Sequence, residues 1–281
     1  MRIANRPCGR GPQILRHLIE YGALSTRSLS AILQPQIDKN NLRDSLNRLY
    51  KRRLVIKRDD KINSGSAVYY EITRDKNKWN EIAKMANVAV CNFEAALARP
   101  VERLHSELCA VWIEKLKRIY PEALFFKDHA VTSSELCKSY LATKGDDRES
   151  LPDFLMLMKS KDGSEPIAVA FEVERFAKSE KRIVQKLRKY SSGSLLDGVV
   201  YINDDASISK KIIRLYNGRA RKDATRINNY GGHFLLCRDT TNPPVDNSIC
   251  AGNCDGKIVD MSRWVSVLSK ISLIKRYDHS F

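Results

Sequence analysis

The chain has 281 residues, of which 43% are hydrophobic and 29% charged, a balance typical of a soluble globular protein. Its 49 Lys and Arg exceed its 33 Asp and Glu by 16 charges, which favours a polyanionic partner, most often nucleic acid, over a merely solvated basic surface. No apolar run reaches the roughly 18 residues of a membrane helix, so we expect no membrane partner. Seven scattered cysteines and a start without a signal-peptide pattern predict a reduced, cytoplasmic chain.

Residues 13–74 predict three short helices followed by two paired strands. Apolar residues recur at helical spacing along each of the three helices. Strands are expected over residues 54–58 and 67–72, joined by a turn at 63–65. The residues expected to stop or cap the helices are Gly22, Ser25, Pro35 and Asp38.

Three short helices and a hairpin resemble the winged helix-turn-helix, in which the third helix enters the major groove of DNA and the wing touches the backbone. Residues 1–78 contain 17 Lys and Arg against 7 Asp and Glu, more than half of the net charge of the chain. This placement favours DNA binding over a domain used only for protein contacts or dimerisation.

The third helix is expected to have an apolar face and a polar face. Leu42, Leu46 and Leu49 lie on the apolar face. On the polar face, Arg43 and Asn47 are expected to contact bases or the groove. The polar residues expected to contact phosphates are Asn40, Lys51 and Arg52.

The chain is predicted to have three parts: a winged helix-turn-helix domain over residues 1–78, a linker over 79–100 with a helix at 79–98, and an α/β domain over 101–281. Helices alternating with strands predict a central mixed sheet with helices on its faces. The elements expected in the α/β domain are helix 101–118, strands 123–126, 151–158 and 167–174, helix 175–190, strand 198–202, helix 207–221, strand 233–237 and helix 260–275.

Two apolar strands of the α/β domain each carry acidic residues at one end. Asp153 opens the first strand, and Glu172 and Glu174 close the second. A basic segment follows at once and includes Lys178 and Lys186. Magnesium prefers oxygen ligands, and cations offset the charge of a phosphodiester. Converging carboxylates beside lysines therefore predict a site for a divalent metal and a phosphodiester.

Roles follow from the chemistry of these groups. Asp153 and Glu172 are expected to bind Mg²⁺ or Mn²⁺, and Glu107 on helix 101–118 to reach the metal or its water. Glu174 is expected as a further ligand or as the base that orients water. The simpler alternative is that Glu172 and Glu174 form a solvated strand face and that Glu107 is a surface residue. The full set of expected catalytic residues is Asp153, Glu172, Glu174, Lys178, Lys186 and Glu107.

The pair Pro152-Asp153, followed by Glu172-Val173-Glu174, resembles the PD-(D/E)xK nuclease superfamily over roughly residues 101–237. In that superfamily Pro-Asp opens one strand and Glu-x-Lys closes the next. Here Glu174 stands where Lys is usual. The resemblance implies a restriction-endonuclease-like fold whose cation comes from Lys178 or Lys186 in the following segment.

A narrower resemblance is to the replication-relaxation family, which is similar to MobC-type plasmid mobilisation relaxases. Its features are a leading winged helix, a His near the start of the next helix, and the acidic pattern followed by a Lys-Leu-x-x-Tyr ending. Here these are His105, Glu172-x-Glu174-Arg175 and the segment from Lys186 to Tyr190. The resemblance implies metal-dependent nicking of one strand at a transfer or replication origin. Tyr190 is expected to be a packing residue rather than a nucleophile.

The leading hypothesis is therefore a nicking enzyme that acts on double-stranded DNA as a monomer or homodimer, with or without other mobilisation or replication proteins. Two alternatives stay open. One is a DNA-binding regulator or replication initiator with a decayed nuclease domain, and the other is a double-strand endonuclease of restriction or transposition type. The chain has no Walker-type Gly-rich loop, which argues against an ATP-driven function.

Overall fold

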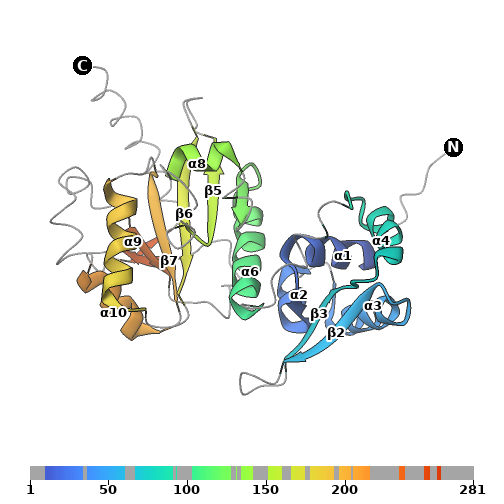
Figure 1. The fold of residues 1–281 in the computed structure, drawn as a ribbon. Coiled ribbons are helices and arrows are strands. Elements are labelled where there is room, and N and C mark those ends of the chain that lie inside the picture. The colour runs from blue at the N-terminus through green and yellow to red at the C-terminus, as the bar shows by residue number, and fades with distance from the viewer. Residues whose placement is uncertain are drawn as a thin grey trace. The chain divides into compact units, whose positions relative to one another are not determined.

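A computed structural model of the chain shows two compact units, Met1–Glu114 and Lys115–Phe281 (Figure 1). We call these the first and second unit. The boundary falls inside helix α6 (Arg103–Ile119), later than the boundaries expected from the sequence. The residues that the structure describes are 10–33, 37–60, 67–90, 93, 103–127, 131, 134–141, 151–159, 166–174, 178–192, 196–203, 205–215, 234–237, 250–253 and 258–260.

The first unit combines helices with a small antiparallel sheet. The three predicted helices and the strand pair are confirmed, and a short strand before the second helix joins them. The sheet order is β1-β3-β2. The elements are α1 (Arg10–Tyr21), β1 (Leu24–Ser25), α2 (Thr26–Leu33), α3 (Lys39–Lys51), β2 (Val55–Asp60) and β3 (Ala67–Ile72).

Local chemistry explains where these helices begin and end. Gly22 has φ 80°, a left-handed conformation that closes α1. The Ser25 hydroxyl accepts a hydrogen bond from the amide of Ser28 at 3.1 Å and so caps α2. Asp38 caps α3 by accepting from the Asn40 amide at 2.7 Å. The expected caps at Ser25 and Asp38 are therefore confirmed, whereas Pro35 lies outside the described residues.

The helix predicted over 79–98 is shorter in the structure. A 3₁₀ turn (Lys76–Lys78) leads into α4 (Trp79–Ala86), and Asn87 ends α4 in a left-handed conformation with φ 53° and ψ 54°. The Trp79 ring nitrogen donates to the carbonyl of Thr73 at 2.9 Å, and Ala86 is fully buried. The helix therefore packs onto the first unit. The sequence pattern continued past Ala86, but the left-handed residue breaks the helical hydrogen bonding.

The second unit is built on a seven-stranded mixed sheet in the order β10-β9-β8-β7-β6-β5-β4. The pairs β6–β7 and β7–β8 are parallel, and the other pairs are antiparallel. This confirms the mixed α/β class. The elements are β4 (Leu124–Lys127), α8 (Glu135–Leu141), β5 (Phe154–Met158), β6 (Ile167–Val173), α9 (Glu180–Ser192), β7 (Gly198–Ile202), α10 (Ala206–Leu215), β8 (Phe234–Cys237), β9 (Cys250–Asn253) and β10 (Ile258–Asp260).

Four elements of the second unit differ from the prediction. Helix α8 falls where a polar loop was expected, and β9 and β10 add two short strands that the sequence pattern did not indicate. The basic helix predicted from residue 175 begins instead at Glu180. The predicted helix over 260–275 lies almost entirely outside the described residues, as do residues 216–221 of the second basic helix.

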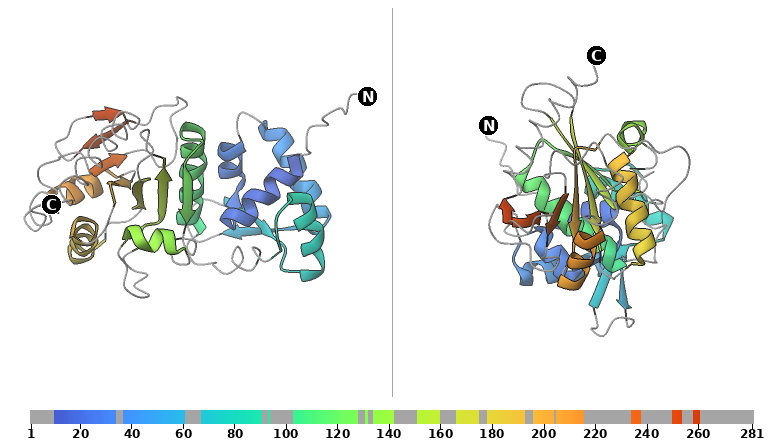
Figure 2. Two further views of the ribbon diagram at one scale, coloured as in Figure 1. Left: turned by 90° about the horizontal axis from the view of Figure 1, so that it is seen from above. Right: turned by 90° about the vertical axis from the view of Figure 1, so that its left-hand side faces the viewer.

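The central strands of the sheet are buried throughout, and alternate residues pack against α8, α9 and α10 on one face. Figure 2 shows α9 lying against one side of the strands. On this face, Ala168 and Ala170 of β6 contact the same core as Ile183 and Leu187 of α9. Because side chains alternate along a strand, Glu172 continues the row of Ala168 and Ala170 toward α9. No helix among the described residues is both long and apolar enough to span a bilayer.

We expect Asp38→Ala to lower the free energy of unfolding of the first unit by about 1 kcal/mol, because the first turn of α3 loses its side-chain acceptor. Urea denaturation measures this difference. Asp44→Ala is the matched control, because Asp44 is an exposed residue inside the same helix and caps nothing. An equal effect of the two substitutions would contradict the capping role.

Candidate functional site

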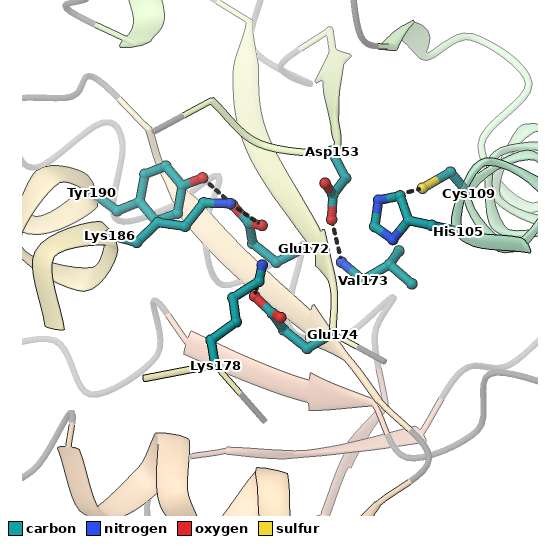
Figure 3. Close-up of polar contacts among 9 residues, drawn as sticks. All are labelled: His105, Cys109, Asp153, Glu172, Val173, Glu174, Lys178, Lys186 and Tyr190. Carbon is teal, nitrogen blue, oxygen red and sulfur yellow. Dashed lines mark hydrogen bonds and ion pairs between the residues drawn. The ribbon is translucent and has the colours of Figure 1, made fainter. Parts of the chain in front are cut away.

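The register between β5 and β6 brings Asp153 beside Glu172. Phe154 pairs with Phe171 in this antiparallel ladder, and their rings stack with centroids 4.5 Å apart. One residue further along, the Asp153 amide donates to the Phe171 carbonyl at 3.0 Å. The Asp153 carboxylate accepts from the Val173 amide at 2.6 Å (Figure 3). This contact holds the half-buried Asp153 at the end of β6.

Glu172 is completely buried at the end of the same strand. Helix α9 supplies a donor to each of its carboxylate oxygens: the Lys186 ammonium contacts one and the Tyr190 hydroxyl the other (Figure 3). Lys186 and Tyr190 stand four residues apart and therefore share one face of α9. On its other side, Glu172 pairs with Tyr201 of the parallel strand β7. Burial of the carboxylate is thus compensated by an ion pair and a phenolic donor.

Burial also sets the electrostatics of Glu172. It raises the pKa of this carboxyl from 4.5 to about 7; the charge of Lys186 opposes the rise, and those of Asp153 and Glu174 add to it. Burial by itself would lower the pKa of Lys186, but the nearby carboxylates raise it above its usual value, which keeps this lysine charged. Three carboxyl groups therefore act on one another electrostatically at the ends of β5 and β6.

Tyr190 was expected to be a packing residue, and the structure adds a polar role. Its hydroxyl donates to Glu172 from a buried position. Burial, and then the charge of Glu172, raise the pKa of Tyr190 well above its usual value. A tyrosine in this state keeps its proton, so it serves as a hydrogen-bond donor and is poorly suited to form a phenolate nucleophile.

Glu174 and Lys178 form a second pair next to the first. The Glu174 carboxylate is buried and lies 2.6 Å from the Lys178 ammonium, whose side chain is 26% exposed. The Glu174 amide donates to the carbonyl of Ile202 at 2.8 Å, which ties the end of β6 to β7. The Lys211 ammonium donates to the Lys178 carbonyl at 2.8 Å. The helical hydrogen bonding of α9 begins at Ser179, whose carbonyl accepts from the Ile183 amide. Lys178 therefore lies in the connection before α9 and not on the helix.

Glu107 has a partner elsewhere. Its carboxylate is buried within the first unit and accepts from the Ser25 amide at 2.6 Å, at the start of α2. It thereby satisfies a backbone donor of that unit. The expected metal-binding and catalytic role of Glu107 stays a prediction that none of its described contacts supports. His105, on the same helix, has its ring nitrogen 3.7 Å from the Cys109 sulfur.

The five residues expected to contact DNA all lie at or just after α3, with their side chains exposed. The opposite face of α3 is buried through Leu42, Leu46 and Leu49. Tyr50, which the sequence did not single out, is 52% exposed on the same helix. The five residues are Asn40, Arg43, Asn47, Lys51 and Arg52.

Arg52 differs from the other four. Its guanidinium forms an ion pair with Glu81 of α4, with a nitrogen–oxygen distance of 2.6 Å and half of the arginine side chain exposed. Arg52 thus connects the end of α3 to α4 within the first unit. The contact of Arg52 with a phosphate stays a prediction. Such a contact would compete with the ion pair to Glu81.

Some cations of α9 and α10 are paired within the second unit. In the structure, Lys186 pairs with Glu172, and Arg214 of α10 pairs with Glu180 of α9. Lys181 and Arg182 remain as exposed cations at the start of α9. Part of the basic charge therefore serves the interior of this unit.

A second group of potential metal ligands lies in the first unit and was missed by the sequence analysis. Ligand atoms of His17, Glu20 and Glu114 lie within 4.8 Å of one another. Tyr21 donates to Glu114 beside them. His17 and Glu20 are separated by one helical turn, but Glu114 is distant in sequence, so no local motif indicates the group. Exposed acidic groups of this kind commonly exist without a metal.

No protein-family model, no curated protein and no solved structure matches the chain.

Glu172→Gln tests the buried state of this carboxyl. The folded protein binds a proton at Glu172 more tightly than the unfolded chain, because burial raises the pKa to about 7. The resulting stability is present below the unfolded pKa of 4.5 and is lost as the pH rises toward 7. From pH 5 to 7.5, we expect the unfolding free energy of wild type, relative to Glu172→Gln, to fall by on the order of 2 kcal/mol.

Urea denaturation across this pH range measures the difference. Glu180→Gln, at the first position of α9 and outside the buried cluster, controls for the loss of one carboxylate. If the difference in unfolding free energy between wild type and Glu172→Gln stayed constant with pH, the buried arrangement of Glu172 would be contradicted.

Proposed function

We propose that this chain is a metal-dependent, site-specific DNA-nicking enzyme of the relaxase type. The observation that carries the proposal is that the register of β5 and β6 sets Asp153 beside Glu172, two residues before Glu174, with Lys186 and Lys178 paired to the two glutamates. The first unit supports it with an exposed basic helix, α3, as the DNA-contacting element. The assignment to a plasmid or mobile-element origin rests on the resemblance to the replication-relaxation family.

The first unit would bind DNA as a winged helix-turn-helix. Its order of helices and its antiparallel strand pair support this architecture, in which α3 would be the recognition helix. The apolar face of α3 is buried in the unit, which leaves Arg43 and Asn47 exposed for a groove. A DNA duplex would release counterions on binding, so affinity would fall steeply with salt.

The second unit would supply the chemistry. The chemical type of the donors suits a hard divalent cation, because carboxylate oxygens are the ligands that Mg²⁺ and Mn²⁺ prefer. Asp153 would be the principal ligand, since it is only half buried, with Glu172 and Glu174 as further ligands. Bound there, a divalent cation would neutralise phosphate charge and make water a stronger nucleophile.

The two lysines would have different tasks. Lys186 is buried against Glu172 and holds that carboxylate in place, so it would act as a positioning residue. Lys178 is a quarter exposed and pairs with Glu174, so it is the lysine of the two that could reach a phosphate from the surface. We therefore assign the cation that offsets developing negative charge to Lys178.

A second candidate function follows from a specific observation. Both carboxylate oxygens of Glu172 already accept hydrogen bonds from Lys186 and Tyr190. The cluster could therefore be a structural ion pair of the core that takes no part in catalysis. In that case the chain would be a DNA-binding regulator or replication initiator on a nuclease scaffold. The two functions differ in whether DNA is cut at all.

Cleavage of supercoiled plasmid, with and without a candidate origin, tests the proposal in Mg²⁺, Mn²⁺ or EDTA. We expect origin-dependent open circles with either metal and none with EDTA. Asp153→Asn should lower the cleavage rate roughly 100-fold or more, because it removes a metal ligand while keeping an acceptor for the Val173 amide. Glu180→Gln is the control, since it removes a carboxylate from α9 outside the cluster.

The products distinguish the alternatives. Linear plasmid would indicate a double-strand endonuclease. Binding without cleavage under any metal would leave the DNA-binding regulator. Cleavage that Asp153→Asn does not reduce would contradict the assignment of the site.

Arg43→Ala tests the first unit separately. We expect it to weaken binding to a duplex selected by the wild-type protein by roughly tenfold or more, and to weaken binding to random duplex less, because a base contact is lost. Fluorescence anisotropy measures both affinities. Lys84→Ala removes an exposed cation from α4 and should leave the ratio of the two affinities unchanged. Equal behaviour of the two variants would argue against α3 as the helix that reads DNA.

A further inference from the structure

Helix α3 ends in a Schellman motif, a common way to close a helix. The Arg53 amide donates to the Tyr50 carbonyl at 2.9 Å, and the Leu54 amide donates to the Leu49 carbonyl at 3.0 Å. Leu54 is fully buried, as expected for the apolar residue that accompanies this motif. The motif requires a left-handed backbone at the position that Arg53 occupies.

Arg53 has φ 59°, in the left-handed region that glycine adopts without cost. Together with Asn87, it is one of two non-glycine residues with positive φ in the described part of the chain. Asn is a common residue in this conformation, whereas an arginine there is unusual. The side chain of Arg53 is exposed, so it contributes no burial that would offset the strain.

The fold gives no separate reason for an arginine at this position. Cations near the end of a helix stabilise its dipole, but Arg48 and Lys51 already occupy the last turn of α3. The ion pair that joins α3 to α4 is made by Arg52 with Glu81. Among the residues that the structure describes, no carboxylate forms an ion pair with Arg53. The fold therefore requires the left-handed backbone at this position but not the arginine, and a strained backbone that carries an exposed charged side chain is typical of a binding residue.

We infer that Arg53 binds the phosphate backbone of duplex DNA at the end of α3, where it anchors the helix independently of base sequence. The inference rests on the proposed function and deepens it by naming a DNA contact beyond those expected from the sequence. The guanidinium is permanently charged and matches a phosphate with two parallel hydrogen bonds. Arg53 follows the last residue of α3, whereas Arg43 and Asn47 lie along the helix where a groove would be read.

Arg53→Gly provides the test, because it relieves the strained backbone and removes the charge at once. We expect the thermal midpoint of unfolding to rise by roughly 2–4 °C. We expect affinity for duplex DNA to fall roughly three- to tenfold, by the same factor on a duplex selected by the wild-type protein and on the unselected random pool. The dependence of log affinity on log salt should become shallower by about one unit.

Three further variants separate charge from backbone. Arg53→Asn keeps a residue that tolerates the left-handed conformation and should lose affinity as Arg53→Gly does. Arg53→Lys keeps the charge but loses the two parallel hydrogen bonds, so it should lose less affinity than Arg53→Gly and leave the salt dependence unchanged. Lys138→Gln removes an exposed cation from α8 and should change neither affinity nor salt dependence.

The possible outcomes are distinct. Unchanged binding by Arg53→Gly, with normal binding by wild type, would overturn the inference alone. Loss confined to the selected duplex would overturn it as well, because it would show a base contact. Wild-type protein that binds no duplex at all would overturn the proposed function, and the inference with it.

Discussion

The second unit depends on how the charge of Glu172 is compensated inside the sheet. A carboxylate without solvent exposure is stable only when donors replace its water, and here both donors come from one face of α9. Removing one partner of a buried ion pair costs about 3–5 kcal/mol, so the contact between Lys186 and Glu172 helps to hold α9 on β6 beside the apolar packing. The positions of the neighbouring carboxylates follow from that of Glu172. The β5–β6 register sets Asp153 beside Glu172, and Glu174 follows Glu172 by two residues.

The first unit follows a different principle. Its elements end at residues that suit local backbone chemistry, and the polar face of α3 is exposed, with Arg52 at its end paired to Glu81. One face of α3 carries the buried leucines, and the other carries exposed Arg, Lys and Asn side chains. The unit therefore concentrates its charge at a surface, whereas the second unit uses part of its charge in its interior.

Much of the fold was predictable because its signals are local. The helical spacing of leucines, Asp38 as a cap, and the apolar runs of β5, β6 and β7 each lie within a few residues of sequence. The candidate site was predictable for a similar reason, since two acidic strand ends of neighbouring strands meet when the strands pair. The elements that were missed have weak local patterns: α8 has only seven residues, and β9 and β10 have four and three.

Other features depended on contacts that no local pattern encodes. The sequence indicated that Lys186 follows the acidic strand, but it could not indicate that Glu172 is entirely buried or that Tyr190 caps its second oxygen. Glu107 was grouped with the acidic residues by its helix and charge, yet its carboxylate serves the Ser25 amide across a long sequence separation. The late start of α9 depends on Ser179, which was expected to lie inside the helix.

The two donors to Glu172 have a consequence for how this sequence can change over time. Replacing Lys186 alone leaves a buried negative charge, and replacing Glu172 alone leaves a buried positive one, so each single step is costly. Replacing Glu172, Lys186 and Tyr190 at the same time by apolar residues of similar volume would avoid the unpaired charge. The residues at these three positions should therefore covary. Relatives of this chain should keep all three or exchange all three, and intermediate combinations should be rare.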